Sequence, residues 1–223
     1  FDAKKLEAHS RGRFKSMTYS LSGGLEKAQG ISVANSNVNP NAEKDGHERK
    51  TFQAYTKTEL SQKLSTSFTS RITEAKMDLD RDGGPGQDDP NYTGSERQYM
   101  AKGSLYYIPL DFYETELALS RSGTKREFQN KIDSSSIEVN DSIYRGVLDK
   151  ATWLNHFKIK ESAVVTIGGE FEKETASANA HYDGVFGPSD FITPEKSPGT
   201  KSAFVSTHLG EDSPFKASLG LRA

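Results

Sequence analysis

The chain has 223 residues, of which 33% are hydrophobic and 27% are charged, and its formal net charge is -2. This length suits one domain or a part of a larger one. Its 29 basic residues are spread among 31 acidic ones without a basic block, so we expect no electrostatically driven binding of nucleic acid. No stretch approaches the roughly 18 consecutive apolar residues of a transmembrane helix, although transmembrane strands remain open.

The absence of cysteine excludes disulfide frameworks, thiolate zinc sites and cysteine nucleophiles. The sequence starts at Phe1 with neither an initiator Met nor a signal segment, so we expect a processed product or a piece of a larger protein.

Apolar and polar residues alternate with a period of two in segment after segment, which is the pattern of half-exposed β-strands. It predicts about ten strands, at residues 5–10, 13–26, 52–60, 63–77, 99–107, 113–120, 153–159, 165–172, 203–209 and 215–222. In the second of these, Met17, Tyr19 and Leu21 share one face and polar residues the other. Several of the segments reach the roughly 9 to 11 residues with which a strand crosses a bilayer.

The connections between these strands alternate in length along the chain. The short ones fall at residues 11–13, 61–62, 109–111, 160–162 and 211–214, and the long ones at 29–49, 78–95, 129–142 and 178–200. In an up-and-down sheet every second connection lies at the same end, so tight turns gather on one side and long loops on the other. The fold class predicted is therefore all-β, an antiparallel up-and-down transmembrane β-barrel, with residues 1–223 as one partial barrel domain.

A soluble β-sandwich is the alternative, because its strands also alternate. The strands at 13–26 and 63–77 are about twice the usual 5 to 6 residues, which favours the barrel. Charged side chains such as Arg71, Glu170 and Arg222 on the polar face suit a water-filled or plugged interior.

Several short runs resemble the barrel strands of TonB-dependent outer-membrane receptors, with most likeness to the vitamin B12 (cobalamin) transporter branch. They are Tyr19–Gly23, Gly30–Ser32, Lys44–Gly46, Trp153–Phe157, Thr166–Glu174 and Ala217–Arg222. The resemblance implies a location in the outer membrane, in contact with its lipid, and uptake of a scarce small molecule such as cobalamin or an iron–siderophore complex. It also implies a plug domain and a segment that contacts the TonB complex; we expect neither within this chain.

The acidic loop at 78–89 has the spacing of a calcium-binding loop. Asp78, Asp80 and Asp82 occupy its first, third and fifth places, Gly83 the sixth, and Asp89 the twelfth. Such oxygen ligands can surround one calcium ion, while the glycine permits a sharp turn. The cobalamin-branch resemblance also implies a calcium-stabilised extracellular loop. The alternative is a solvated loop without metal, because the last ligand is Asp instead of Glu and the flanks are strands.

The sequence contains no nucleophile elbow, no paired histidines and no phosphate-binding loop, so we expect no catalytic site and no enzyme. The first hypothesis is thus a transport protein, with loops 29–49, 78–95, 129–142 and 178–200 on the extracellular side. Two alternatives remain at this stage. One is a complete small outer-membrane barrel that acts as an enzyme or adhesin through its long loops, and the other is a soluble calcium-binding β domain.

Overall fold

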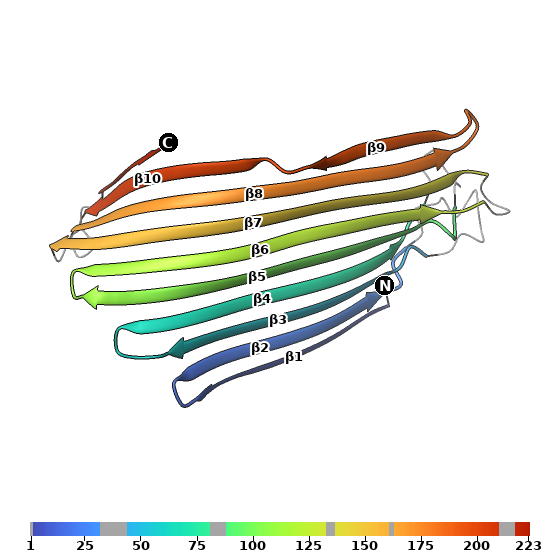
Figure 1. The fold of residues 1–223 in the computed structure, drawn as a ribbon. Coiled ribbons are helices and arrows are strands. Elements are labelled where there is room, and N and C mark those ends of the chain that lie inside the picture. Colours follow the sequence, from blue (N-terminus) through green and yellow to red (C-terminus); the bar gives the residue numbers. More distant parts are fainter. Residues whose placement is uncertain (1, 32–43, 81–87, 133–136, 161–162, 210–216) are drawn as a thin grey trace.

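The computed structural model describes residues 2–31, 44–80, 88–132, 137–160, 163–209 and 217–223. They form one antiparallel sheet (Figure 1). Its strands are β1 (Ala3–Phe14), β2 (Met17–Ala28), β3 (His47–Glu59), β4 (Leu64–Asp78), β5 (Thr93–Leu110), β6 (Tyr113–Asn130), β7 (Val139–Lys160), β8 (Ala163–Asp183), β9 (Ser189–Lys196), β10 (Gly199–Leu209) and β11 (Ala217–Arg222). No helix in the described part of the chain is long and apolar enough to span a membrane.

Each strand pairs with the next one along the chain, except that β9 and β10 both pair with β8. β10 covers the first half of β8 and β9 the second half, so the two together fill one row beside it. The about ten predicted strands correspond to the ten rows of this sheet. The fold class predicted from the alternation is confirmed in its all-β, up-and-down character.

The prediction of a loop over the whole of 178–200 was wrong. The end of β8 and all of β9 lie in this range and form a hairpin. The alternation did not predict β9, because Phe191 and Ile192 are adjacent apolar residues and because Pro194 lies inside the strand. Pro194 is tolerated because the β8–β9 register shifts near it, at a bulge where its missing N–H costs no ladder bond.

Two predicted turns also lie inside strands. Residues 11–13 belong to β1, which continues to Phe14, and the chain turns at Lys15, whose φ is 52°. Gly12 suggested a turn, but it lies opposite Tyr19, and a Cβ at this position would come within 2.8 Å of the Tyr19 hydroxyl oxygen. Pro109 belongs to β5, at a register shift that accommodates it. Of the predicted turn at 160–162, Lys160 is the last residue of β7, and residues 161–162 lie outside the described residues, as does the predicted turn at 211–214.

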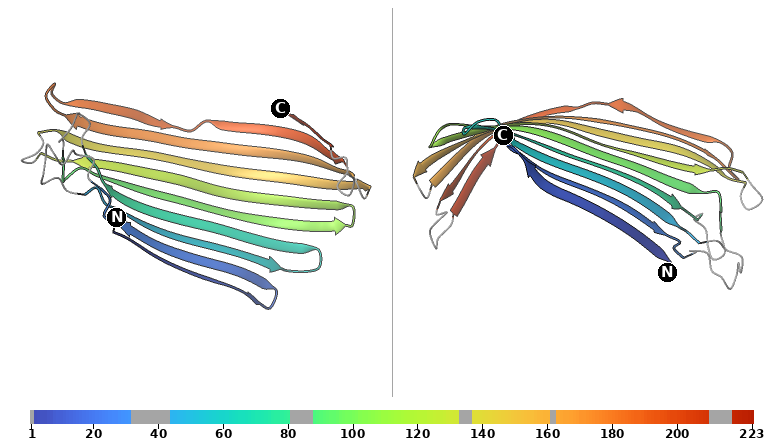
Figure 2. Two further views of the ribbon diagram at one scale, coloured as in Figure 1. Left: turned by 180° about the vertical axis from the view of Figure 1, so that it is seen from behind. Right: turned by 90° about the horizontal axis from the view of Figure 1, so that it is seen from below.

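The sheet is long, curved and open (Figure 2). β7 and β8 have 22 and 21 residues, about twice the roughly 9 to 11 that cross a bilayer, and extend farthest at the end opposite the tight turns. β1 and β11 form the two edges and do not pair with each other in the described residues. The predicted loops at 29–49, 78–95 and 129–142 share the end to which β7 and β8 extend, as the length alternation predicted.

Candidate functional site

The register collects the apolar side chains of neighbouring strands on one face of the sheet. In one row Phe52 pairs with Ile72, and Ile72 with Tyr99; in another, Leu117 pairs with Leu105 on one side and with Trp153 on the other. These side chains are exposed in the sheet, and the exposed fraction of Trp153 is 56%. Among the described residues, Ala118 is the only buried hydrophobic residue. A single layer without an apolar core must be covered by something else, and lipid is the solvent that suits it.

Polar groups on this apolar face are satisfied by neighbouring protein groups. Trp153 donates its indole N–H to the Thr115 hydroxyl at 3.0 Å, and Thr115 donates to the backbone carbonyl of Leu154 at 3.0 Å. Tyr113 donates its hydroxyl to the side-chain oxygen of Asn155 at 2.8 Å, and Asn155 is buried. Internal satisfaction of this kind is what a lipid environment requires, because hydrocarbon offers no hydrogen bonds.

One charged residue in each of β1–β8 and β10 marks the limit of the apolar face on the side of the long connections, which we call the upper side. Each is two positions along its strand from the nearest apolar residue on the same face. We call this set the charged rim; it comprises Lys4, Lys27, Lys50, Glu74, Arg97, Arg121, Asp149, Lys173 and Lys201. When the cross-strand pairs are followed from β1 to β8, Lys4 is level with Asn179 of β8. Lys201 of β10 is level with Phe171, which is eight residues lower on β8.

The charged rim therefore descends obliquely across the sheet. At about 3.3 Å per residue and about 4.8 Å between strands, the descent is ~26 Å over ~38 Å of sheet width, a slope of about 35°. Strands of transmembrane barrels tilt by roughly 35 to 45° from the membrane normal. A flat membrane surface crossing strands of this tilt would follow the same oblique line.

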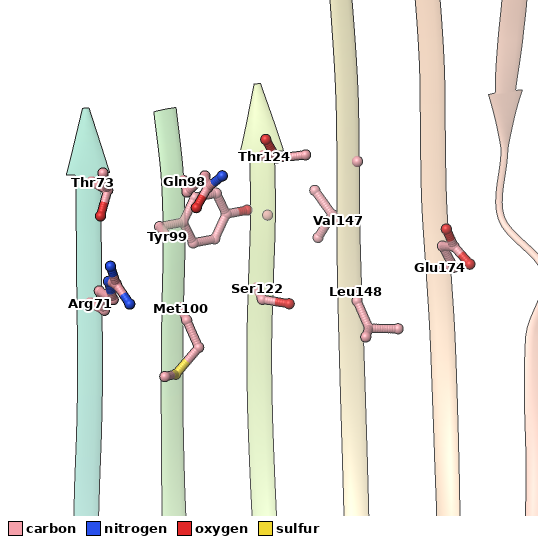
Figure 3. A pocket seen from close by; sticks show the side chains of 12 residues that line it. Arg71, Thr73, Gln98, Tyr99, Met100, Ser122, Thr124, Val147, Leu148 and Glu174 are labelled. Atoms are coloured by element: carbon pink, nitrogen blue, oxygen red, sulfur yellow. The ribbon is translucent and has the colours of Figure 1, made fainter. Parts of the chain in front are cut away.

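The opposite, polar face is hollowed. A hollow of about 410 Å³ crosses β4 to β8 (Figure 3); nine of the 12 residues that line it are on the polar face, and the other three lie between them in a row of the apolar face. Arg71 lies at its β4 side and Glu174 at its β8 side, with Gln98 and the apolar Met100 and Leu148 between them. A second hollow, of about 430 Å³, crosses β1 to β4. Hollows over both halves of the sheet identify the polar face as the concave one.

The larger group of ions on the concave face joins three strands. Lys150 of β7 donates to Glu172 at 2.8 Å and also contacts Glu170 of β8. Arg222 of β11 donates to Glu170 at 2.7 Å and to the hydroxyl of Ser202 at 2.9 Å. The Glu170 carboxylate thus forms ion pairs with Lys150 on one side and Arg222 on the other, and it links β11 to β7 and β8.

A second ion group lies higher on the concave face. Glu96 accepts hydrogen bonds from Gln98 at 2.9 Å and from Arg126 at 2.8 Å. These bonds, that of Gln98 first, lower the pKa of Glu96 below its ordinary value, so this carboxylate stays ionised beside the first hollow. The hollow itself is lined by an anion at Glu174, a cation at Arg71, and amide and hydroxyl groups. Such a set can hold a small molecule with both polar and apolar parts.

The predicted calcium ligands are only partly within the described residues. Asp80 accepts the backbone N–H of Asp89 at 3.3 Å, and the fully buried Asp89 accepts a hydrogen bond from Asn130 at 2.8 Å. Asp78 ends β4, and Asp82 lies outside the described residues. In the described parts of the chain, no three His, Cys, Asp or Glu residues come together as a metal site. Asp78, Asp80 and Asp89 alone do not form a ligand set, and the calcium site stays a prediction.

Neither protein-family models nor curated proteins match the sequence. Solved structures do match the fold. The ferric yersiniabactin uptake receptor FyuA from Yersinia pestis aligns over 92% of this chain and 34% of its own, with a TM-score of 0.65 and 9% identity. The ferripyoverdine receptor of the outer membrane of Pseudomonas aeruginosa aligns over 100% of this chain and 35% of its own, with a TM-score of 0.69 and 6% identity.

This chain has the fold of part of an outer-membrane receptor barrel. The RagAB peptide importer also aligns, over 98% of this chain and 31% of its own, with a TM-score of 0.68 and 12% identity. Several of the matched structures are TonB-dependent receptors, so the resemblance to this family is confirmed at the level of the fold, whereas the likeness to the cobalamin branch stays a prediction. The chain spans about a third of the length of these matched proteins.

Within a barrel of this kind the convex apolar face is the outer surface and the concave face lines the interior. The polar side chains singled out in the sequence, Arg71, Glu170 and Arg222, are all on the interior face. The sequence did not reveal that Arg71 and Glu174 border one hollow, because they are on β4 and β8, separated by three strands. Only the register between strands brings them together, and local alternation carries no signal for it.

Proposed function

We propose that this chain forms part of the barrel wall of a TonB-dependent outer-membrane receptor that takes up a scarce ligand. The observation that carries the proposal is the oblique apolar face, bounded by the charged rim, on a sheet whose only buried hydrophobic residue in the described part is Ala118. A soluble sandwich would bury this face under a second sheet, whereas here it is open to lipid.

In the complete receptor, a plug domain packs against the concave face, and the ion groups around Glu96 and Glu170 are available to contact it. The TonB complex supplies the energy for ligand release through a segment outside this chain. The long connections, with the β8–β9 hairpin, face the exterior and contribute to ligand capture. The same end also holds the predicted calcium loop at 78–89.

The ligand is a small molecule of the iron-chelate or cobalamin type. The matched receptors for ferric yersiniabactin and ferripyoverdine favour an iron chelate. The hollow between Arg71 and Glu174 supports a ligand with both polar and apolar parts, and its volume of about 410 Å³ is within the roughly 300 to 1,000 Å³ of small-molecule sites.

Membrane placement can be tested with single cysteines, because these 223 residues contain none and any cysteine elsewhere in the full-length protein can first be replaced by serine. In the full-length protein in outer membranes, Leu119→Cys should resist a water-soluble maleimide, since Leu119 is on the apolar face and 60% exposed. Glu195→Cys in β9, above the charged rim, should react within minutes. Equal and rapid labelling of both cysteines in intact membranes would rule out the membrane-spanning wall.

Transport is tested by filling the hollow. Ser122→Trp places a large ring in it, and Ser70→Trp, the matched control, places the same ring on the lipid-facing side. Uptake of radiolabelled ferric chelates and of labelled cobalamin by energised cells should fall at least tenfold for Ser122→Trp with one of the two ligands, and stay unchanged for Ser70→Trp. Uptake that is insensitive to an uncoupler, or absent for every ligand in wild-type cells, would contradict a TonB-dependent receptor.

A further inference from the structure

We propose that the hollow across β4 to β8 binds zwitterionic ligands, with a carboxylate at Arg71 and an ammonium group at Glu174, the two ligand charges being ~13 Å apart. This inference rests on the proposed function and deepens it, because it names the charge class of the ligand that the same hollow takes.

Arg71 and Glu174 are the two ends of one row of the interior face. Five directly paired residues on β4–β8 form this row and line the hollow (Figure 3): Arg71, Met100, Ser122, Leu148 and Glu174. The row crosses four strand spacings of about 4.8 Å, so its two ends are ~19 Å apart. Side chains stand roughly perpendicular to a sheet, so the two charged groups keep about this separation and do not pair with each other.

Neither of these charges is neutralised by a neighbour. Both side chains are exposed, and neither forms an ion pair with another residue in the described parts of the chain. By contrast, the carboxylates of Glu96 and Glu170 on the same face each accept a hydrogen bond from an arginine. The hollow therefore leaves one cation and one anion available for charge-assisted hydrogen bonds to a ligand.

The charges around the hollow have the same polarity. In this row and the next two rows toward the tight turns, every Asp, Glu, Lys or Arg of β1–β5 is basic, whereas the acidic residues are all on β8. The basic ones are Arg11, Arg13, Lys57, Arg71 and Lys102, and the acidic ones are Glu170, Glu172 and Glu174. Lys150 of β7 interrupts this division, but it is bound by both Glu170 and Glu172. This field orients a zwitterion with its carboxylate toward β4.

The separation of the two ends sets the length of the ligand. A hydrogen bond of about 2.8 Å at each end leaves ~13 Å between the ligand's own charges. At about 3.3 to 3.6 Å per residue, this is the length of an extended tetrapeptide, and a dipeptide spans only about half of it. Met100 and Leu148 flank the hydroxyl of Ser122 midway, which suits a chain with both apolar and hydrogen-bonding groups.

The hollow is at the level of the charged rim. Ser122 directly follows the rim residue Arg121, and Glu174 directly follows Lys173. Under the proposed function, this level is the outer boundary of the membrane, on the side of the long connections. A ligand that enters between these connections reaches the hollow first.

The test measures the binding of tetra-alanine with free termini to the full-length protein in detergent, by isothermal titration calorimetry. Its N-acetylated and C-amidated forms each lack one charge, and dialanine keeps both charges but is too short to reach both residues. The wild-type protein should bind free tetra-alanine about tenfold or more tightly than each of these three compounds, because each of them loses one charge-assisted hydrogen bond. Equal binding of the free and capped forms, or no binding of the free form, would overturn the inference.

An exchange of the two charges separates direct binding from a structural effect. Arg71→Glu and Glu174→Lys should each weaken the binding of free tetra-alanine by about tenfold or more, and the double variant should recover it, because the zwitterion can then bind in the reverse direction. Lys76→Glu and Asp183→Lys are the matched controls on β4 and β8; they lie on the opposite face, outside the hollow, and should leave binding unchanged. A double variant that binds as weakly as the single ones would also refute the inference.

Energised uptake of ferric chelates is scored in parallel. If wild-type cells take up a chelate but the protein does not bind free tetra-alanine, only the charge class is wrong. If the protein binds tetra-alanine as expected but cells take up no ligand in an uncoupler-sensitive manner, the proposed function fails and the zwitterion site remains.

Discussion

A charge placed on the lipid-facing side should be far more costly than the same charge one residue away on the interior side. Phe68 is on the apolar face of β4, six residues from the rim residue Glu74, and is 46% exposed. At about 3.3 Å per residue and a tilt of about 35°, it lies ~16 Å below the rim, well inside an apolar band about 25 Å tall. Phe68→Arg should therefore destabilise the inserted protein by about 2 to 4 kcal/mol.

Ser67→Arg is the matched control, because Ser67 is the preceding residue and faces the interior. It should change stability by less than about 1 kcal/mol, since a surface substitution in contact with water has little effect. Unfolding of the full-length protein from phosphatidylcholine vesicles by urea, followed by fluorescence, measures both values. If Phe68→Arg is neutral in vesicles, or if the two variants lose the same stability, the apolar face is not in lipid and the assignment of faces is refuted.

Three further outcomes are expected. Gly123→Ala should lose about 1 to 3 kcal/mol in the same assay, because its Cβ would lie 2.6 Å from the ring of Tyr99, and Tyr99→Ala should recover part of that loss in the double variant. The side chains of Asp190 and His181 are hydrogen-bonded at 2.7 Å, and this bond raises the pKa of His181 above 6.5. The stabilisation of the β8–β9 hairpin by this pair is therefore complete below about pH 6.5 and is lost as the pH rises through the pKa of His181 in the folded protein. Hydrogen exchange of β9, corrected for the intrinsic rate, should accelerate as the pH rises in the wild type and not in Asp190→Asn. Calcium should protect 78–95 from protease, and unchanged cleavage with and without a chelator would remove the metal site.

The two faces of the sheet could be predicted from the sequence because alternation is a local property. Each strand carries its own period of two, so Met17, Tyr19 and Leu21 identify the outward face of β2 without knowledge of its neighbours. Errors arose where one residue type has two structural uses. Gly12 and Pro109 are typical of turns, yet one accommodates the ring of Tyr19 and the other occupies a bulge.

The hollow and the charged rim could not be predicted in the same way, because both depend on register between strands. Long connections such as 29–46 and 79–92 do not fix register, so a shift of two residues would keep every side chain on its face and still separate Arg71 from Gln98. In the folded sheet, register is set by cross-strand pairs such as Tyr99 with Gly123 and Phe204 with Gly168, in which a ring covers a glycine.

The open edges at β1 and β11 mean that the apolar face is stable in lipid only within a complete barrel. β1 has 12 residues and β11 has 6, and within the described residues no strand pairs with the backbone N–H and C=O groups on the outer side of either. Within hydrocarbon, each such group costs several kcal/mol, so a sheet with these edges exposed is less stable in lipid than its apolar face alone suggests. Under the proposed function, further strands of the receptor barrel pair with both edges. Insertion of this apolar face and closure of the barrel must then occur together, because the lipid that stabilises the face would penalise the edges.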